Sequence, residues 1–380
     1  MRLAWQNIAH ERTRFLVTIL GIACATLLMI TQGSILMGFL GAASKIIDAT
    51  DSDLWIAGRG ASCFEFPVVL ERRFVELAHS VSGVESTTRI LTRIVEFRKS
   101  DGNQQLVTLI GAERGAGSRF PAPHIGNGAA SDPDSILIDE SSSGLLIQSG
   151  GLSSAQSGGL PSAVEINEHR ANVTGRTSGF SSFLGTPYVF SSYTDGLRYT
   201  GMRPTETMFI LVRVRSGASI ADVKRQLMTR LPNVDVWTKK EFARKAQMYW
   251  SSQTGAGGAI LAAALLGFII GLAVVSQAIY ATTMEHIEEF ATLKAIGATH
   301  GFVIRVIVTQ ALVCGIAGYL LGIALSEPVI RQAKSAIPWL STPAWLPLAI
   351  LPPALAICMF ASVLSVRAAL AVEPARVFRA

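Results

Sequence analysis

Hydrophobic positions are concentrated in four long runs, and the stretch between the first two runs has an ordinary mixed composition. No Asp, Glu, Lys or Arg occurs in residues 15–44, 246–284, 306–326 or 335–366. About 20 apolar residues, each rising about 1.5 Å along a helix, cross the hydrocarbon core of a bilayer. Because backbone groups inside a bilayer need internal hydrogen-bond partners, the four runs are predicted to be membrane-spanning helices.

The pattern predicts an α-helical membrane protein with four transmembrane helices and an α+β extracytoplasmic (periplasmic) domain inserted between helices 1 and 2. The expected segments are a cytoplasmic amphipathic N-terminal segment at 1–14, helix 1 at 15–44, the periplasmic domain at 45–250 with a β-rich insert at 112–205, helix 2 at 251–284, a cytoplasmic helix at 285–300, helix 3 at 301–326, a short periplasmic loop at 327–342, helix 4 at 343–366 and a cytoplasmic tail at 367–380. The first run is much longer than the apolar part of a signal peptide, about 7–15 residues, so we expect a retained anchor.

Basic residues beside the runs predict the orientation, because Lys and Arg in short flanks mark the cytoplasmic side of a membrane protein. They lie before the first run, in the turn after the second and in the C-terminal tail: Arg2, Arg12, Arg14, Lys294, Arg305, Arg367, Arg376 and Arg379. Both termini are therefore expected in the cytoplasm of a bacterium, with a multi-pass chain in the cytoplasmic (inner) membrane and the large domain in the periplasm.

Within the periplasmic domain, two similar β-α-β halves are expected to surround the insert, and together they favour a ferredoxin-like split arrangement. The predicted strands are 53–57, 92–98, 104–111, 136–139, 163–166, 188–190, 207–215 and 234–237, and the predicted helices are 67–80 and 219–231. A further amphipathic helix at 239–250 is expected to continue without a break into helix 2.

Composition and charge narrow the function classes. Charged residues make up 16% of the chain, against about 25% in ordinary soluble domains. The net charge of +6 comes largely from basic residues beside the apolar runs, so membrane lipids are expected partners and nucleic acid is not. Cys24, Cys314 and Cys358 lie in apolar runs and are interpreted as buried small apolar residues, while Cys63 stands alone in the periplasmic domain.

The chain carries no motif of an enzyme or metal protein. It has no Gly-x-x-x-x-Gly-Lys-Ser/Thr phosphate loop, no His-Glu-x-x-His and no Gly-x-Ser-x-Gly, and these are the motifs that bind nucleotide phosphates, hold zinc or present a nucleophile. We therefore expect a non-catalytic protein that binds neither a metal nor a cofactor. The absence of charge within the runs also disfavours an ion-coupled transporter.

Three smaller features predict contacts in or near the membrane. Gly267 with Gly271, and Gly318 with Gly322, have the four-residue spacing that lets helix backbones pack closely. The alternative is that membrane helices are simply rich in glycine. Trp5 is placed to anchor the N-terminal segment at the membrane interface.

The cytoplasmic stretch after helix 2 is the most informative for function. Ile287, Phe290 and Leu293 lie on one face of its predicted helix, with acidic residues on another, and Gly297 ends it. The alternative is a helix resting on lipid headgroups, but anionic membrane surfaces favour basic faces. An acidic amphipathic helix is better suited to docking on a protein.

In their order, four features make the chain resemble the FtsX/MacB-type permeases of ABC transporters (type VII, mechanotransmission), and within them the DevC-like branch. They are the Ala4-Trp5-Gln6-Asn7 opening, the outer domain between helices 1 and 2, the Glu289-Phe-Ala-Thr-Leu-Lys-Ala-Ile-Gly-Ala stretch and the Glu373-Pro-Ala-Arg ending. The chain departs from many relatives at residues 286–288, where they have a basic residue, and at Gln310, where they have an acidic one.

The resemblance implies a homodimer that works with two copies of a separate cytoplasmic ABC ATPase, which binds ATP and Mg. It implies that the helix after helix 2 is the coupling helix, with the ATPase contacted by Glu289, Phe290, Leu293, Lys294 and Gly297. ATP-driven movement would pass along helices 1 and 2 to the periplasmic domain. DevC-like members resemble partners of a periplasmic adaptor and an outer-membrane channel that export lipids or other amphiphiles.

Two alternatives within the same superfamily remain open. One is a lipoprotein-releasing permease, and the other is an FtsX-like regulator of an extracellular cell-wall hydrolase. The large outer domain favours transport over a minimal regulatory scaffold. A membrane-bound enzyme is disfavoured because no catalytic constellation is present.

Overall fold

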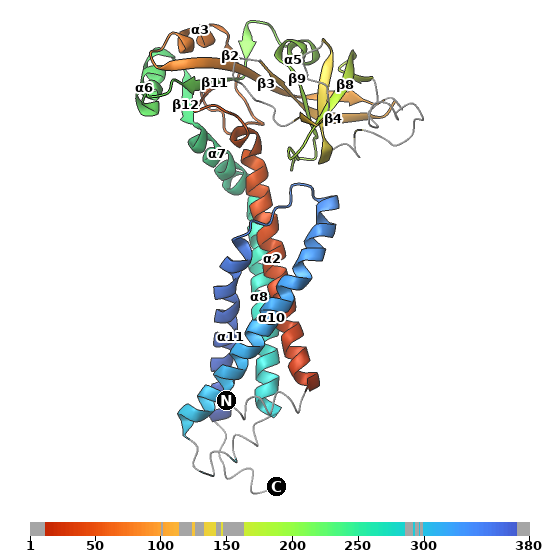
Figure 1. Cartoon of the computed structure of the whole chain (residues 1–380), viewed down its shortest axis with the longest axis vertical. Helices are drawn as coiled ribbons and strands as arrows, with labels where there is room; N and C mark the ends of the chain where they lie inside the picture. Colours follow the sequence, from red (N-terminus) through yellow and green to blue (C-terminus); the bar gives the residue numbers. More distant parts are fainter. Residues whose placement is uncertain are drawn as a thin grey trace. The chain divides into compact units, whose positions relative to one another are not determined.

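The computed structural model describes residues 12–99, 102–113, 124–125, 133–141, 146, 163–285, 292, 296 and 299–370. The chain divides into two compact units (Figure 1). The helical unit comprises Met1–Gly38 and Ala256–Ala380, and the mixed unit comprises Phe39–Gly255. The boundary falls inside the first long helix, which contributes residues to both units.

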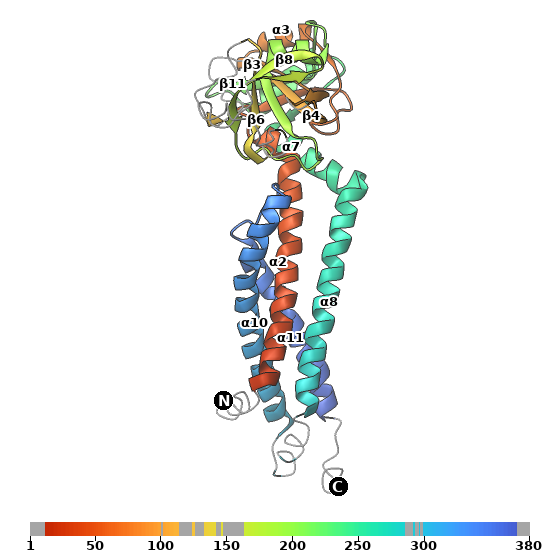
Figure 2. The ribbon, with the colours of Figure 1, turned by 90° about the vertical axis from the view of Figure 1, so that its right-hand side faces the viewer.

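Long apolar helices run alongside one another in the described part of the helical unit (Figure 2). They are α2 (Arg12–Asp48), α8 (Gly255–Glu285), α10 (His300–Ala336) and α11 (Leu346–Leu370). The first three contain stretches long and apolar enough to cross a membrane, namely Leu16–Asp48, Gly255–Gln277 and Ile304–Ala336. In α11 the corresponding stretch, Leu346–Ser362, is shorter.

The third long helix corrects the predicted loop at 327–342. α10 continues to Ala336 and contains Pro328 in its interior. Arg331 Nη2 donates to Glu327 Oε1 at 3.1 Å on its exposed surface, an i,i+4 pair of the kind that supports a helix. The first charged residue, Glu327, therefore marks the end of the apolar stretch, whereas the helix itself continues to Ala336. In the same way α2 extends to Asp48, beyond the predicted 44, and Ser44 Oγ donates to Asp48 Oδ2.

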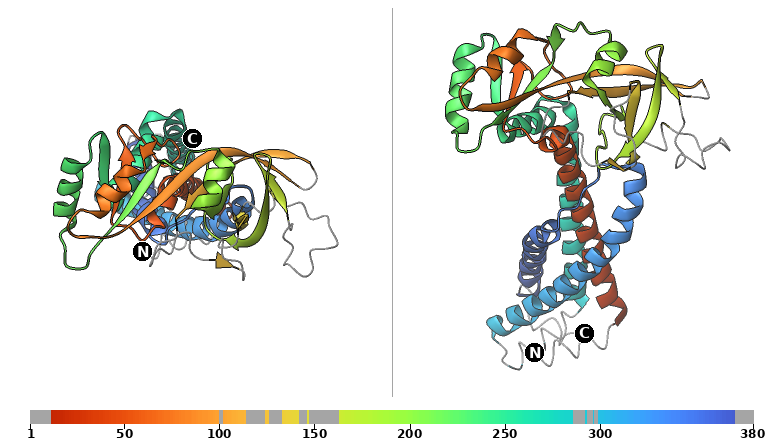
Figure 3. Two further views of the ribbon diagram at one scale, coloured as in Figure 1. Left: turned by 90° about the horizontal axis from the view of Figure 1, so that it is seen from above. Right: turned by 45° about the horizontal axis from the view of Figure 1, so that its top comes forward.

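The mixed unit is built on one large sheet that the long strand β3 crosses from end to end (Figure 3). The strand order is β12-β1-β11-β3-β4-β9-β6-β8-β5, with β7 beside β3 and β8, and β2 pairs separately with β10. The strands are β1 (Leu54–Gly58), β2 (Leu70–Glu71), β3 (Val84–Arg98), β4 (Gln104–Ala112), β5 (His124–Ile125), β6 (Ser135–Asp139), β7 (Val164–Ile166), β8 (His169–Thr177), β9 (Tyr188–Ser192), β10 (Glu206–Thr207), β11 (Phe209–Val214) and β12 (Val234–Thr238). The helices are α3 (Arg73–His79), α5 (Tyr193–Thr200), α6 (Ile220–Arg230) and α7 (Lys239–Met248).

The two predicted β-α-β halves form one compact subdomain. Strands β1 and β3 with α3, and β11 and β12 with α6, give the antiparallel order β12-β1-β11-β3. This is the ferredoxin-like split arrangement predicted from the sequence. Its core packs Leu54 and Ile56 of β1 against Phe74 of α3 and against Val223 and Leu227 of α6.

The β-rich insert forms a second core on the other end of the sheet. It packs β4, β6, β7, β8 and β9 around side chains such as Leu109, Ile138 and Val189. The β4–β9 and β6–β8 pairs are parallel. The sequence pattern does not predict β8, because two arginines obscure its alternating burial. It also does not predict α5, a short helix that Ser192 caps by accepting from the backbone N–H of Asp195. The Gly- and Ser-rich stretch at 149–162 of the insert lies outside the described residues.

Candidate functional site

Two segments that connect to membrane helices meet inside the mixed unit. One is the end of α2, residues 39–48, and the other is α7 with the turn that follows it. Two loops hold them in place, residues 59–69 between β1 and β2, and residues 178–187 between β8 and β9. We call this region the junction, because here the chain passes between the mixed unit and the long helices α2 and α8.

A chain of aromatic rings runs through the junction. Phe183 of the β8–β9 loop packs edge-on against Phe39 of α2, with ring centroids 5.1 Å apart, and against Trp250, at 4.8 Å. Phe66 of the β1–β2 loop lies 5.9 Å from both Tyr249 and Trp250. Aromatic pairs at such distances add to the stability that burial provides. Four segments far apart in the sequence are thereby joined around Trp250.

Glu65 supplies the polar centre of the junction. The Trp250 indole Nε1–H donates to Glu65 Oε2 at 3.3 Å, and the Tyr188 hydroxyl donates to Glu65 Oε1 at 3.3 Å. Tyr188 and Trp250 are only 1% and 6% exposed. One carboxyl group therefore connects the β1–β2 loop to β9 of the insert and to the segment that leads into α8.

Burial dominates the electrostatics of this centre. Desolvation raises the pKa of Glu65 above its usual 4.5, against the hydrogen bonds from Trp250, Cys63 and Tyr188 that lower it. Burial, followed by the negative charge of Glu65, raises the pKa of the Cys63 thiol to about 12. Cys63 is fully buried, so an intermolecular disulfide at this position is excluded in the folded chain.

The connection from α7 to α8 is interrupted, which corrects the prediction of a continuous helix. After α7 the chain forms a π-helical turn at Tyr249–Gln253, and Thr254 is extended, with φ −104° and ψ 148°. The hydroxyls of Ser252 and Thr254 donate to the carbonyls of Met248 and Trp250, each at 2.6 Å. Such side-chain bonds compete with the helical ladder. Single π-helical turns inside a helical path occur frequently at functional sites.

In contrast, the start of α7 and the end of α2 are firmly attached. Thr238 and Glu241 form a capping box at the first turn of α7. Lys239 Nζ donates to the carbonyl of Thr50, just after α2, at 2.6 Å. At the other end of α7, Gln247 Nε2 donates to Ser44 Oγ of α2 at 3.0 Å. The end of α2 and both ends of α7 are thus held together within the mixed unit.

Glycines of the helical unit face α2. A Cβ placed on Gly318 would lie 2.6 Å from the Cβ of Ile22, and one on Gly322 would lie 2.6 Å from the Cβ of Thr26. On α8, a Cβ at Gly271 would lie 3.1 Å from Ala25, whereas Gly267 has only Gln32, at 3.6 Å. α10 therefore packs against α2 more closely than it could if residues other than glycine stood at 318 and 322. Cys314 and Cys358 are buried in this unit but Cys24 is exposed, which corrects its predicted burial.

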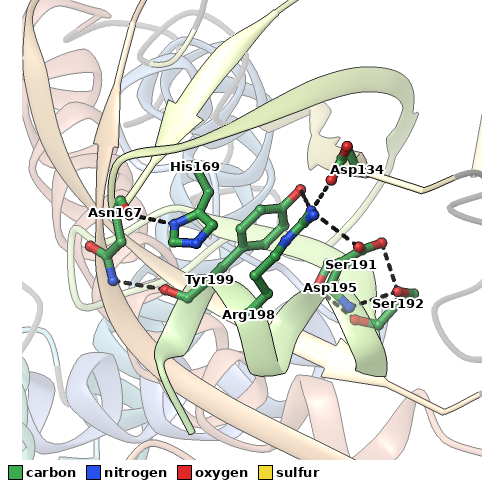
Figure 4. Close-up of polar contacts among 8 residues, drawn as sticks. All are labelled: Asp134, Asn167, His169, Ser191, Ser192, Asp195, Arg198 and Tyr199. Carbon is green, nitrogen blue, oxygen red and sulfur yellow. Dashed lines mark hydrogen bonds and ion pairs between the residues drawn. The ribbon is translucent and has the colours of Figure 1, made fainter.

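A second polar network fixes the outer subdomain (Figure 4). Arg198 of α5 pairs with Asp134 and Asp195 and lies over the Tyr199 ring, with the guanidinium carbon 5.2 Å from its centroid. Asn167, in the β7–β8 turn, donates to the Tyr199 carbonyl at 2.8 Å and accepts from the backbone N–H of Glu96 at 3.0 Å. Through Asn167 the network ties α5 and the β7–β8 turn of the insert to β3, where Glu96 lies.

The remaining predicted site residues lie outside the described residues. These are the five coupling positions, Glu289, Phe290, Leu293, Lys294 and Gly297, and the interface anchor Trp5. Among the described residues no group of His, Cys, Asp and Glu has the arrangement of a metal site. Pattern analysis missed the junction, although two signals were present: a single carboxylate between Phe64 and Phe66, and the polar run at 251–254 directly before an apolar helix.

Two family models match consecutive parts of the chain. The model described as MacB-like periplasmic core domain matches residues 15–230, and the one described as FtsX-like permease C-terminal matches residues 258–374. Two relatives from Mycobacterium tuberculosis, one from strain CDC 1551 / Oshkosh and one from strain ATCC 25618 / H37Rv, are each named an uncharacterized ABC transporter permease. Each is 24% identical to this chain over 388 residues, covering 99% of this chain and 98% of the relative.

Two solved structures are similar to about half of this chain. The periplasmic region of MacB from Actinobacillus actinomycetemcomitans is 13% identical, with a TM-score of 0.40, covering 52% of this chain and 92% of that one. The extracellular domain of the noncanonic ABC-type transporter YknZ from Gram-positive bacteria is 12% identical, with a TM-score of 0.36, covering 50% of this chain and 99% of that one.

Proposed function

The chain belongs to the MacB- and FtsX-like family of ABC transporter permeases, and we propose that it transmits ATPase movement to a periplasmic domain to drive export of a lipid or another amphiphile. Membership implies a cytoplasmic membrane location, a periplasmic domain and a separate ATPase partner. We propose four spans with both termini in the cytoplasm, α11 being the fourth.

The proposed assembly is a homodimer with two copies of the ATPase, which bind ATP and Mg. The permease itself is non-catalytic and binds no cofactor. Energy enters at the coupling helix, where Phe290 and Leu293 face the ATPase, with Glu289, Lys294 and Gly297 beside them. Outside the cytoplasm, a periplasmic adaptor receives the movement of the mixed unit.

The observation that carries this proposal is the unbroken course of α2. It is a single helix of 37 residues, from Arg12 to Asp48, whose last turns lie inside the mixed unit. There Phe39 contacts Phe183, and Ser44 bonds to Gln247. A helix is stiff along its axis, so a displacement at the cytoplasmic end of α2 moves the junction with it. α8 exposes apolar side chains, and residues 255–284 contain no Asp, Glu, Lys or Arg, so this helix offers no polar conduit.

The test measures movement directly in the complete complex. Permease and ATPase are reconstituted in lipid nanodiscs, with spin labels on the exposed residues Leu106 and Met228 of the mixed unit. Distances between the two copies are then compared without nucleotide and with ATP bound to a hydrolysis-deficient ATPase. The proposal requires a change in the distance distribution on ATP binding. An identical distribution in both states, in complexes that still hydrolyse ATP when the ATPase is wild type, would refute it.

The substrate class separates export from its two alternatives. Export predicts that lipid or amphiphile is transferred to the adaptor in an ATP-dependent way. A lipoprotein-releasing permease would transfer lipidated proteins to a periplasmic chaperone, and an FtsX-like regulator would activate a cell-wall hydrolase without transfer. Co-purification of the full complex from its host, followed by mass spectrometry of bound proteins and lipids, distinguishes the three.

A further inference from the structure

The mixed unit has an exposed apolar surface directly before α8 in the chain. Phe66 and Met248 expose 52% and 62% of their surface, and the Phe66 ring lies 5.9 Å from that of Tyr249, the residue after Met248. We call Phe66, Met248 and Tyr249 the apolar tip. Exposed apolar side chains that form a contiguous patch mark sites that bind a protein or a membrane.

The same surface carries two unpaired positive charges. Lys240, Arg244 and Met248 follow each other at four-residue intervals on α7 and are all exposed, so they share one face of the helix. Neither Lys240 nor Arg244 forms an ion pair with any residue that the structure describes. The neighbouring lysines are engaged, since Lys239 donates to a carbonyl and Lys245 lies over the Trp237 ring at 4.6 Å.

Along α7 this face changes from basic to apolar in the direction of α8. Eight residues separate Lys240 from Met248, which is about 12 Å at about 1.5 Å per residue. The polar layer on each side of a bilayer is roughly 5–8 Å thick. The face therefore has the length to reach from outside the headgroups, past the phosphates, to the upper part of the acyl chains.

We propose that Lys240, Arg244 and the apolar tip bind the outer leaflet of the cytoplasmic membrane. The two basic side chains contact anionic lipid phosphates, and Phe66, Met248 and Tyr249 enter the region between headgroups and acyl chains. Interfacial segments combine basic and apolar faces in this way, and aromatic rings concentrate at this depth. The inference rests on the membrane placement of α8, and it goes beyond the proposed function by giving the mixed unit a contact with lipid.

Continuity with the membrane-spanning helix identifies lipid as the occupant. Only residues 249–254 separate Met248 from Gly255, where α8 begins. α8 exposes a long series of apolar side chains, among them Leu261, Leu265, Leu266 and Ile269. Lipid covers those positions, so the apolar tip lies within a short length of chain from the bilayer surface. A protein partner at the tip would have to compete with lipid there.

The first experiment places a photoreactive p-benzoyl-phenylalanine at Phe66 or Met248 in the full chain, in nanodiscs containing phosphatidylglycerol. Both positions are exposed, so the larger side chain fits without displacing a buried neighbour. Illumination should attach lipid, detected by intact mass. The probe at Leu266, 58% exposed on α8, is the positive control, and the probe at Leu106, 57% exposed on β4 in the mixed unit, is the negative one.

The controls separate failure of this inference from failure of the membrane placement. The inference is supported if probes at positions 266, 66 and 248 all give lipid adducts in severalfold higher yield than the probe at position 106. Adducts at 266 alone overturn it while leaving the membrane span in place, and adducts at none of these positions overturn the span itself. Crosslinks from position 66 or 248 to a second copy or to another protein, in place of lipid, would also overturn the inference that these residues bind the membrane.

The second experiment tests the charges. The double variant Lys240→Ser/Arg244→Ser should lower the lipid adduct yield at 66 severalfold in phosphatidylglycerol and have little effect in phosphatidylcholine alone. The variant Arg170→Ser/Arg203→Ser removes the same charge from exposed positions elsewhere in the mixed unit and should leave the yield unchanged. An equal loss in both variants, or in both lipids, would show that the basic face of α7 does not bind anionic lipid.

Discussion

Glu65 and Trp250 are joined by a hydrogen bond of 3.3 Å, although 185 residues separate them in the chain. The bond connects the ferredoxin-like part of the mixed unit to the π-helical turn that leads into α8. Tyr188 binds the other oxygen of the same carboxyl group. The junction thus depends on one buried side chain whose charge changes with pH.

The first prediction concerns the pH dependence of stability. Burial raises the pKa of Glu65 above its usual 4.5, so the folded state holds the proton more tightly than the unfolded state does. The stability from protonated Glu65 is fully present below pH 4.5 and is lost as pH rises through the folded pKa. The variant Glu65→Gln is neutral throughout, so thermal unfolding in detergent should show a flatter pH profile above pH 4.5.

A control separates charge from packing. Glu241 is mostly exposed and its pKa is lowered, with Lys224 the leading favourable partner against some desolvation. The charged form of Glu241 therefore stabilises the fold above its usual pKa, and this contribution is lost as pH falls. The variant Glu241→Gln should be less stable than the wild type at neutral pH, and the difference should shrink in acid. If Glu65→Gln and the wild type gave parallel pH profiles, ionisation of Glu65 would have no part in the stability of the junction.

The second prediction tests transmission through α2. Gly41 lies in the α2 segment inside the mixed unit, and a Cβ added there would contact nothing within 4 Å. Gly41→Ala should therefore be tolerated, and it should stabilise the helix by up to about 1 kcal/mol. Gly41→Pro removes a backbone hydrogen bond and clashes with the preceding turn, at a cost of about 3 kcal/mol or more.

The expected result is a split between ATPase activity and movement of the mixed unit. Gly41→Pro should still bind and hydrolyse ATP through its partner but should lose the ATP-dependent distance change between the labels. Gly41→Ala should keep both. Transmission through α2 would be disproved by a normal distance change in the proline variant, provided that circular dichroism shows the helix to be interrupted.

The third prediction concerns the packing of α10 on α2. Gly318→Ala and Gly322→Ala place a methyl group 2.6 Å from the side chains of Ile22 and Thr26. Overpacking of this size costs about 1–3 kcal/mol when the backbones cannot move apart. Gly258→Ala on α8 is the matched control, because its Cβ would meet nothing within 4 Å. Thermal unfolding in detergent should rank both α10 variants below the control, and equal stability of all three would mean that the helices are not in close contact.

Much of this architecture follows from the sequence, and the exceptions have physical causes. Apolar runs and alternating strands depend on local pattern, so the long helices and the ferredoxin-like order were predictable. The interruption between α7 and α8 was not predicted, because an apolar run begins at Gly255 directly after it. The polar residues Ser251, Ser252 and Thr254 were the signal for it in the sequence. The partnership of Glu65 with Trp250 and Tyr188 could not be predicted, since it depends on how distant loops meet.

The last prediction tests where energy enters. Phe290 and Leu293 share one face of the helix that the sequence predicts after α8, and the proposed function has the ATPase dock there. Replacing either with Asp puts a charge into a docking face, which costs several kcal/mol unless the charge is paired. Each variant should fail to retain the ATPase on affinity purification. Thr292→Asp adds the same charge at an exposed position between them and should retain it. Full recovery of the ATPase with Phe290→Asp and Leu293→Asp would move the docking site away from this helix.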